Sequence, residues 1–79
     1  MSDTEKKLRE IVAGLGGFDA DFDRKAHFFR DLGVESTKAL ELLFDLEDTF
    51  QISLPDEEYN EVQHLDDLIG LIDKLVAEA

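Results

Sequence analysis

The stretch Asp31-Leu32-Gly33-Val34-Glu35-Ser36, with the helical pattern that follows it to about Phe50, organises the rest of the chain. Gly33 allows a sharp turn or a close approach of the backbone. Ser36 stands where an apolar helical rhythm begins, so we expect its hydroxyl at the N-terminus of a helix. Such a terminus presents unpaired N–H groups and a partial positive charge, and both favour a phosphate. A plainer interpretation is that Ser36 caps the helix through its side-chain oxygen.

Apolar residues recur at helical spacing along the chain, and no convincing alternating strand pattern appears. We expect an all-α four-helix bundle forming a single domain over residues 1–79, with three main helices and one short one. The expected helices span residues 3–14, 36 to about 50, 56–61, and from 65 or 66 to about 77. Residues 16–35 then form a long loop between the first two helices, which is unusual in a small domain and is typically functional or disordered.

Local signals mark several of these boundaries. Ser2-x-x-Glu5 has the spacing of a capping box, and the glycine-rich stretch 14–17 ends the first helix. Asp56 is a candidate cap of the short third helix. The long loop carries four phenylalanines, too many for a disordered segment, and we expect Phe28 to pin it onto the helices.

The charge balance limits the possible partners. Asp and Glu number 20 against 8 Lys and Arg, which gives a formal net charge of −12. Nucleic acid is therefore excluded as a partner, since phosphate binding needs the opposite sign. Basic protein surfaces are favoured, and the same charge also keeps a small protein monomeric. No cysteine, no apolar run of transmembrane length and no signal-peptide core are present, so we expect a cytoplasmic protein without a membrane partner.

Two apparent metal-binding patterns lack residues that a metal site requires. Asp19-x-Asp21-x-Asp23 imitates the start of an EF-hand loop, but Arg24 replaces the required glycine and Arg30 the bidentate glutamate. A solvated acidic turn is the better interpretation. His27 and His64 are isolated, with no metal-ligand spacing between them, so the sequence predicts no metal site.

The second helix carries two sets of apolar residues. One stripe is expected to face the core: Ala39, Leu42, Leu43, Leu46 and Phe50. Leu40 and Phe44 form a smaller pair on the adjacent face, among carboxylates and beside Ser36. An apolar anchor with an acidic rim is typical of a docking surface. The alternative is that this pair packs under the long loop.

The motif Phe28-x-x-Asp31-Leu32-Gly33-x-Glu35-Ser36 resembles the Phe-x-x-Asp-Leu-Gly-x-Asp-Ser signature of acyl carrier proteins. The likeness continues through Glu41-Leu42, Leu46-Glu47 and Phe50 to Ile52-x-Leu54-Pro55-Asp56. This resemblance implies that 4′-phosphopantetheine is attached covalently to Ser36 and carries acyl groups as thioesters on its thiol. It also implies cofactor-site roles for the other motif residues: Asp31, Leu32, Gly33 and Glu35.

The resemblance further implies the partners of the chain, which would perform no catalysis itself. A phosphopantetheinyl transferase (holo-carrier synthase), using coenzyme A and magnesium, would install the arm. Acyl-transferring, condensing or modifying enzymes of fatty-acid biosynthesis, polyketide synthesis or a related pathway would dock through basic patches. The implied partner-binding residues are Thr37, Leu40, Glu41, Phe44, Glu47 and Asp48.

Four residues differ from the usual family pattern and indicate a specialised relative rather than the housekeeping carrier. Glu35 replaces the common aspartate, Thr37 replaces a leucine, Lys38 stands at a frequently acidic position, and His64 stands where a threonine cap is typical.

The sequence also offers signals for or against three other functions. A peptidyl, aminoacyl or D-alanyl carrier is suggested by Phe28-Phe29, although Val34 and the strong negative charge favour the acyl type. A small acidic interaction module without a prosthetic group would use the Leu40/Phe44 face alone. A hydrolase is disfavoured because no histidine or other base is placed beside the serine.

Overall fold

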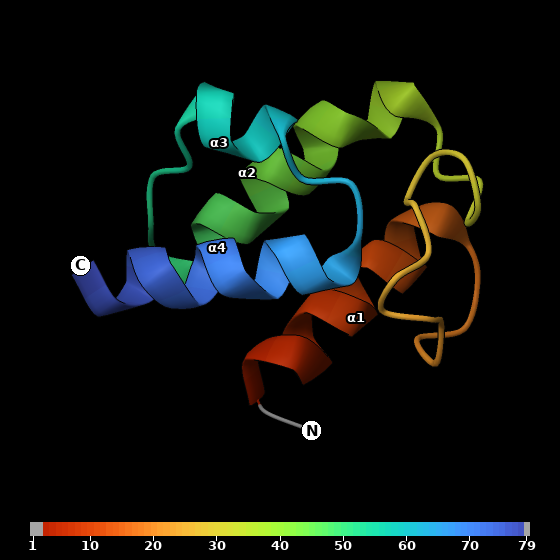
Figure 1. Ribbon diagram of the computed structural model, residues 1–79, viewed down its shortest axis with the longest axis horizontal. Helices are drawn as coiled ribbons and strands as arrows, with labels where there is room; N and C mark the ends of the chain where they lie inside the picture. Colours follow the sequence, from red (N-terminus) through yellow and green to blue (C-terminus); the bar gives the residue numbers. More distant parts are fainter. Residues whose placement is uncertain (1–2, 79) are drawn as a thin grey trace.

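The fold consists of four α-helices and one short 3₁₀ helix (Figure 1). The computed structural model describes residues 3–78. Its helices are α1 (Asp3–Gly16), η1 (Ser36–Lys38), α2 (Ala39–Phe50), α3 (Asp56–Asn60) and α4 (Leu65–Glu78). Residues 3–78 contain no strand, so the predicted all-α bundle with three main helices and one short helix is confirmed. None of the helices in that range has the length and apolar character needed to cross a bilayer.

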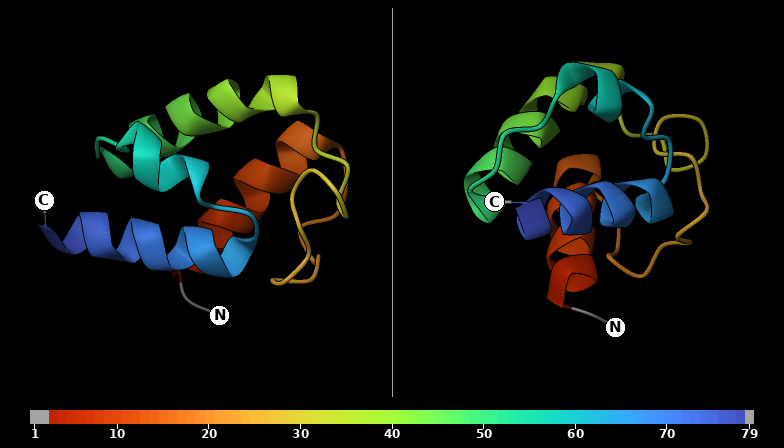
Figure 2. Two further views of the ribbon diagram at one scale, coloured as in Figure 1. Left: turned by 45° about the horizontal axis from the view of Figure 1, so that its top comes forward. Right: turned by 60° about the vertical axis from the view of Figure 1, so that its left-hand side comes forward.

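The first helix joins the other two long helices. α1 packs against both α2 and α4, which lie on opposite sides of the molecule, while the loop of residues 17–35 covers one end (Figure 2). The core is built from side chains spaced three or four residues apart on each helix, so that they share one face. Its fully or almost fully buried members from the helices are Leu8, Val12, Leu42, Leu43, Leu46, Leu65, Leu68 and Ile72. Burying each such side chain stabilises the fold by about 1.5–3 kcal/mol.

The long loop is tied to α1 by a buried arginine. Arg9 is only 7 % exposed, and its Nη1 donates hydrogen bonds to the carbonyl oxygens of Ala20 at 2.8 Å and Phe22 at 2.6 Å. Its Nε donates to a carboxylate oxygen of Glu5 at 2.9 Å, and the guanidinium lies 5.0 Å from the centre of the Phe22 ring. The guanidinium is therefore shared between a charge partner one helical turn away and the backbone of the loop.

The far part of the loop is anchored to the core and to α4. Phe28 is 2 % exposed, and its backbone N–H donates to the carbonyl oxygen of Gln63 at 2.8 Å. Arg24 forms an ion pair with Asp66 at 2.9 Å. The prediction that Phe28 pins the loop is confirmed, and the result is a fixed approach to the segment that precedes Ser36.

Two of the predicted helix ends need correction, and a third lies outside the described residues. α1 continues beyond residue 14 to Gly16 and ends where Gly17 adopts φ +74°, a left-handed conformation that glycine accepts without strain. Asp56 is not the cap of α3, because Pro55 occupies that position in an extended conformation and Asp56 is already helical. The capping box of Ser2 lies outside the described residues, although Glu5 is seen paired with Arg9.

Candidate functional site

Ser36 is the first residue of η1, which runs directly into α2. Gly33 makes the turn before it with φ +75°, and Glu35 is extended with φ −67° and ψ 137°. Because Gly33 lacks a Cβ, its left-handed conformation costs little free energy. The backbone can therefore change direction sharply between the packed loop and the helix. The side chain of Ser36 is exposed.

The hydroxyl of Ser36 does not cap the helix. Glu35 occupies the N-cap position and makes no side-chain cap hydrogen bond. Within the described part of the chain, no hydrogen bond or ion pair involves Ser36 Oγ. The capping interpretation is therefore wrong: the preceding turn shifts Ser36 one position into the helix. The hydroxyl is consequently free in solvent, at the positive end of the continuous η1–α2 helix.

The motif residues ahead of Ser36 hold the backbone in place. A carboxylate oxygen of Asp31 accepts a hydrogen bond from the backbone N–H of His27 at 2.9 Å. In return His27 Nδ1 accepts the backbone N–H groups of Phe29 at 3.2 Å and Arg30 at 3.1 Å. The arrangement resembles a capping box. The His27 ring nitrogen takes the place of the usual hydroxyl, and the Asp31 carboxylate bonds back to the His27 backbone N–H. Asp31 thus fixes the turn, and His27, which the sequence left without a role, is its partner.

The residues on either side of the turn join it to the core. Val34 is 5 % exposed, and its backbone N–H donates to the carbonyl oxygen of Phe28 at 2.9 Å. Leu32 is half-buried and packs against the core cluster. Of the five predicted cofactor-site residues, Asp31 and Leu32 therefore support the loop, Gly33 and Glu35 shape the entry to the helix, and Ser36 presents an exposed hydroxyl.

An open hollow of about 490 Å³ lies directly beside Ser36. Its walls come from the start of the η1–α2 helix and from α3, and they include Ser36, Thr37, Leu40, Leu43, Asp56 and Tyr59. The hydroxyl of Tyr59 donates a hydrogen bond to the carbonyl oxygen of Ala39 at 2.7 Å, which joins α3 to the first turn of α2. Burial raises the pKa of Tyr59 to about 12, so the phenol stays protonated as a donor at neutral pH.

The predicted docking pair is exposed. Leu40 and Phe44 are 58 % and 59 % exposed, so the alternative that they pack beneath the long loop is wrong. Glu41 and Asp48 are exposed near them, and Glu41 pairs with Lys38 at 3.6 Å. The structure therefore leaves apolar surface in water next to carboxylates, on the same helix as Ser36.

Glu47 differs from the other predicted partner residues. It is half-buried, and its carboxylate accepts a hydrogen bond from the backbone N–H of Leu54 at 2.8 Å. That contact holds the extended link of residues 52–55 against α2. Thr37 is exposed and lines the hollow beside Ser36.

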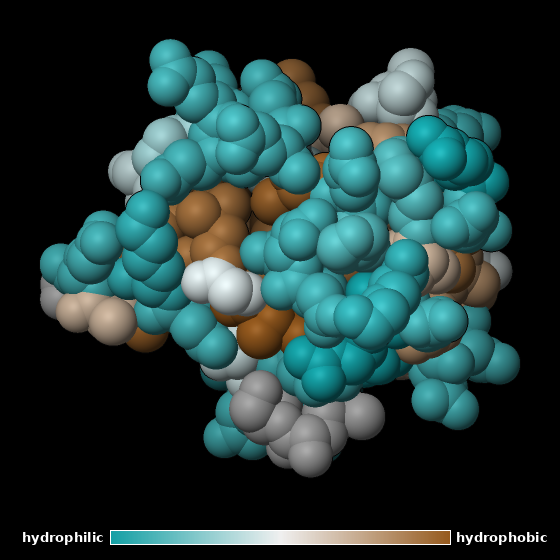
Figure 3. All heavy atoms as spheres, viewed as in Figure 1, coloured by the Kyte–Doolittle hydropathy of each residue, from teal (hydrophilic) through white to brown (hydrophobic). Residues whose placement is uncertain are grey.

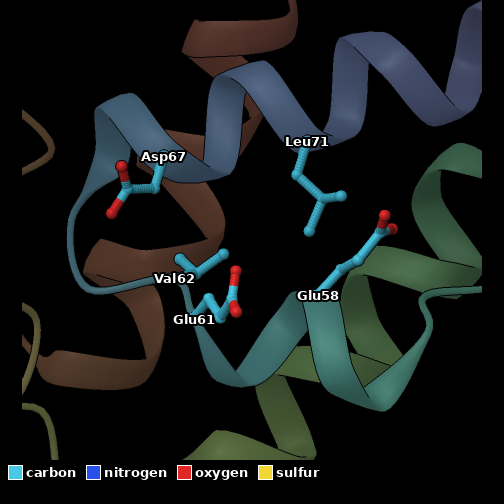
Figure 4. A pocket seen from close by; sticks show the side chains of 5 residues that line it. All are labelled: Glu58, Glu61, Val62, Asp67 and Leu71. Atoms are coloured by element: carbon cyan, nitrogen blue, oxygen red, sulfur yellow. The ribbon is translucent and has the colours of Figure 1, made fainter.

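A second hollow, of about 290 Å³, lies between α3 and α4 and shares no lining residue with the first. Apolar surface gathers there within a hydrophilic rim (Figure 3), and Figure 4 shows Val62 and Leu71 among the carboxylates of Glu58, Glu61 and Asp67. Two of these acids have other partners: Glu58 pairs with Lys74 at 2.9 Å, and Asp67 accepts the Gln63 backbone N–H at 3.2 Å. No group of three His, Cys, Asp or Glu side chains within residues 3–78 is arranged to hold a metal ion.

A comparison with protein-family models gives a match over most of the chain. Residues 6–72 match the family described as the phosphopantetheine attachment site. The match covers most of the chain, from the first turns of α1 into α4, and includes the whole segment from the long loop to the hollow beside Ser36.

Proposed function

Because the chain belongs to the family of phosphopantetheine-attachment domains, we propose that Ser36 is its attachment residue and that the protein carries acyl groups between enzymes. Domains of this family bear a covalently attached 4′-phosphopantetheine and are carriers rather than catalysts, modified by a phosphopantetheinyl transferase. The observation that supports Ser36 most strongly is its exposed, unbonded hydroxyl at the start of the η1–α2 helix.

The surroundings of Ser36 fit a phosphate ester. Attachment forms a bond between Ser36 Oγ and the pantetheine-side phosphorus of coenzyme A. It breaks the bond from that phosphorus to the bridging oxygen of the pyrophosphate, which leaves with 3′,5′-ADP, and the hydroxyl proton must also leave. Among the described residues no basic side chain contacts this oxygen, so the transferase has to supply the base. The positive end of the η1–α2 helix favours the charged product, since a helix N-terminus attracts anions. The attached group would supply a terminal thiol, on which an acyl group is held as a thioester.

The exposed pair Leu40 and Phe44 supports the proposed docking of partner enzymes. Their apolar surface would be buried against the partner, while Glu41 and Asp48 would face basic residues. Glu47 would act less directly, because its carboxylate is already engaged with the backbone of Leu54. We assign the transferase and acyl-handling enzymes to this face, in the cytoplasm where coenzyme A is available.

The pathway we favour is fatty-acid synthesis, polyketide synthesis or a related specialised route. Val34 and the net charge of −12 support an acyl cargo over a peptidyl, aminoacyl or D-alanyl one. Identification of the thioester on the protein in its native cell separates these cargoes. An interaction module without a prosthetic group would instead leave Ser36 unmodified and would depend only on Leu40 and Phe44.

Labelling with a transferase tests the attachment residue. Incubation of the full chain with coenzyme A, magnesium and a phosphopantetheinyl transferase should add the mass of one phosphopantetheinyl group. Ser36→Ala should abolish the addition. Ser53→Ala is the matched control, because Ser53 is also exposed but lies in the link before α3. Labelling of Ser36→Ala, or none of the wild-type chain by several transferases, would contradict the proposal.

A further inference from the structure

Tyr59 borders two neighbouring spaces. The open hollow of about 490 Å³ has Ser36 in its wall, and a more enclosed cavity of about 130 Å³ lies on the other side, lined in part by Phe28 and Leu42. Ala39, Tyr59 and Asn60 line both spaces. The Tyr59 hydroxyl donates a hydrogen bond to the Ala39 carbonyl oxygen at 2.7 Å, so two residues that line both spaces are joined to each other.

The enclosed cavity is suited to an apolar occupant. Phe28 and Leu42 are 2 % and 4 % exposed, and Phe29 and Val62 complete the apolar part of its wall. Only two side chains of its lining, Tyr59 and Asn60, carry polar atoms. A charged or strongly polar group would lose its hydration there without compensation. A cavity of about 150 Å³ accommodates a molecule the size of benzene, so about 130 Å³ corresponds to a chain of roughly six carbon atoms or fewer.

We propose that Tyr59 determines the length of acyl chain that the protein can shelter. The acyl group is held on the thiol at the far end of the arm, so the arm folds back through the open hollow beside Ser36 and the acyl group reaches the smaller cavity by passing the ring of Tyr59. With that ring in place, the space beyond it takes a short acyl chain and leaves the rest of a long chain in water. This inference rests on the proposed function, because the occupant is the cargo of the arm on Ser36.

The chemistry of the boundary supports this role. The ring of Tyr59 belongs to α3, a helix of five residues that is joined to α2 through this hydroxyl. A smaller side chain at position 59 would remove both the ring that fills the boundary and the hydrogen bond that holds it there. The two spaces would then merge into one channel leading from the hollow beside Ser36 to the apolar cavity.

The test compares melting temperatures of chains that carry different cargoes. The transferase loads the full chain with pantetheine arms from butanoyl-, hexanoyl- or dodecanoyl-coenzyme A, and intact mass confirms each product. In the wild type, the hexanoyl form should melt about 5 °C above the free-thiol form, since several methylene groups leave water. The dodecanoyl form should melt no higher than the hexanoyl form.

Substitution of Tyr59 by a smaller side chain should allow the protein to shelter a longer acyl chain. In Tyr59→Ala the dodecanoyl form should melt clearly above the hexanoyl form, and Tyr59→Leu, which retains apolar packing, should change in the same direction if the alanine variant does not fold. Glu57→Ala is the matched control on α3, since Glu57 is exposed and lines neither space, and it should behave as wild type.

The contradicting outcomes are distinct. A melting temperature that rises from hexanoyl to dodecanoyl equally in wild type and both Tyr59 variants would overturn the role of Tyr59 while leaving the carrier function intact. Failure of Ser36 to accept any arm would overturn the proposed function and this inference with it.

Discussion

The loop of residues 17–35 is held by buried and charged contacts, whereas the surface of α2 beside Ser36 leaves large apolar side chains in water. Arg9, Phe28 and Asp31 each fix one part of the loop through contacts to backbone groups or to the core. On the other side, Leu40 and Phe44 are more than half exposed, and α3 is joined to α2 and α4 by the contacts of Tyr59 and Glu58. The difference separates a region that sets the position of Ser36 from one that is open to partners and cargo.

The largest effect, a loss of fold stability, is expected when the contacts that hold the loop of residues 17–35 are removed. Arg9→Ala removes both hydrogen bonds to the loop carbonyls and the ion pair with Glu5, and it should destabilise the fold by about 3 kcal/mol. Urea denaturation measures the change. Lys6→Ala is the control, because Lys6 is exposed on the same helix and should alter stability by about 0.5 kcal/mol or less. Equal effects of the two substitutions would show that Arg9 does not secure the loop.

Substitutions on the exposed surface of α2 should lower the rate of transferase labelling and leave the free energy of unfolding nearly unchanged. Leu40→Ala should lower kcat/KM for labelling by the transferase about tenfold, because it removes an apolar anchor of the proposed docking surface. Its effect on the free energy of unfolding should stay within about 0.5 kcal/mol. Val76→Ala, an exposed apolar residue on α4, is the matched control and should label normally. Unchanged labelling of Leu40→Ala would remove this residue from the docking surface.

Added salt should raise the melting temperature of the protein and slow its labelling by the transferase. With a net charge of −12, the crowded carboxylates repel one another, so moderate salt should raise the melting temperature. The same screening should slow transferase labelling several-fold, since steering toward a basic partner weakens. A melting temperature that falls with salt would mean that attractive pairs, such as Arg24–Asp66, outweigh the repulsion.

The smallest effect concerns alkaline pH at the link between α3 and α2. Burial raises the pKa of Tyr59 to about 12 from 10.0, so the unfolded chain loses this proton at lower pH than the folded one. The contribution of Tyr59 to stability is therefore full below pH 10 and falls as pH rises towards 12. Tyr59→Phe should flatten that part of the stability profile. Tyr59 is the only tyrosine in the sequence, so its ultraviolet absorbance follows the ionisation directly; a midpoint near 10 in the folded protein would contradict the account.

Helix positions could be predicted from the sequence because they depend on local apolar spacing. The pattern Leu65, Leu68 and Ile72 places α4, and all three side chains are buried as expected. The exact cap positions depend on the conformation of the preceding residues, which spacing does not specify. Ser36 and Asp56 both have side chains that favour a cap, yet Glu35 and Pro55 take the extended cap conformation.

The contacts that fix the loop could not be predicted because their partners are backbone groups or lie far along the chain. A charged residue such as Arg9 on an amphipathic helix is normally assigned to the exposed face, and its burial depends on carbonyls 11 and 13 residues away. Histidine is a familiar metal ligand, but the spacing His27-x-x-x-Asp31 is instead the signal for the local hydrogen bonds that the structure shows. At the candidate site, the motif indicated Ser36, but only the structure reveals that its hydroxyl is unbonded and that Tyr59 borders its hollow.

The central claim is that the Ser36 hydroxyl carries the arm in the living cell. Intact-mass measurement of the protein purified from its own cell, followed by peptide mapping, tests it most directly. The account predicts one phosphopantetheinyl group, free or acylated, on the peptide that contains Ser36. An unmodified protein, or a group attached at another residue, would contradict it.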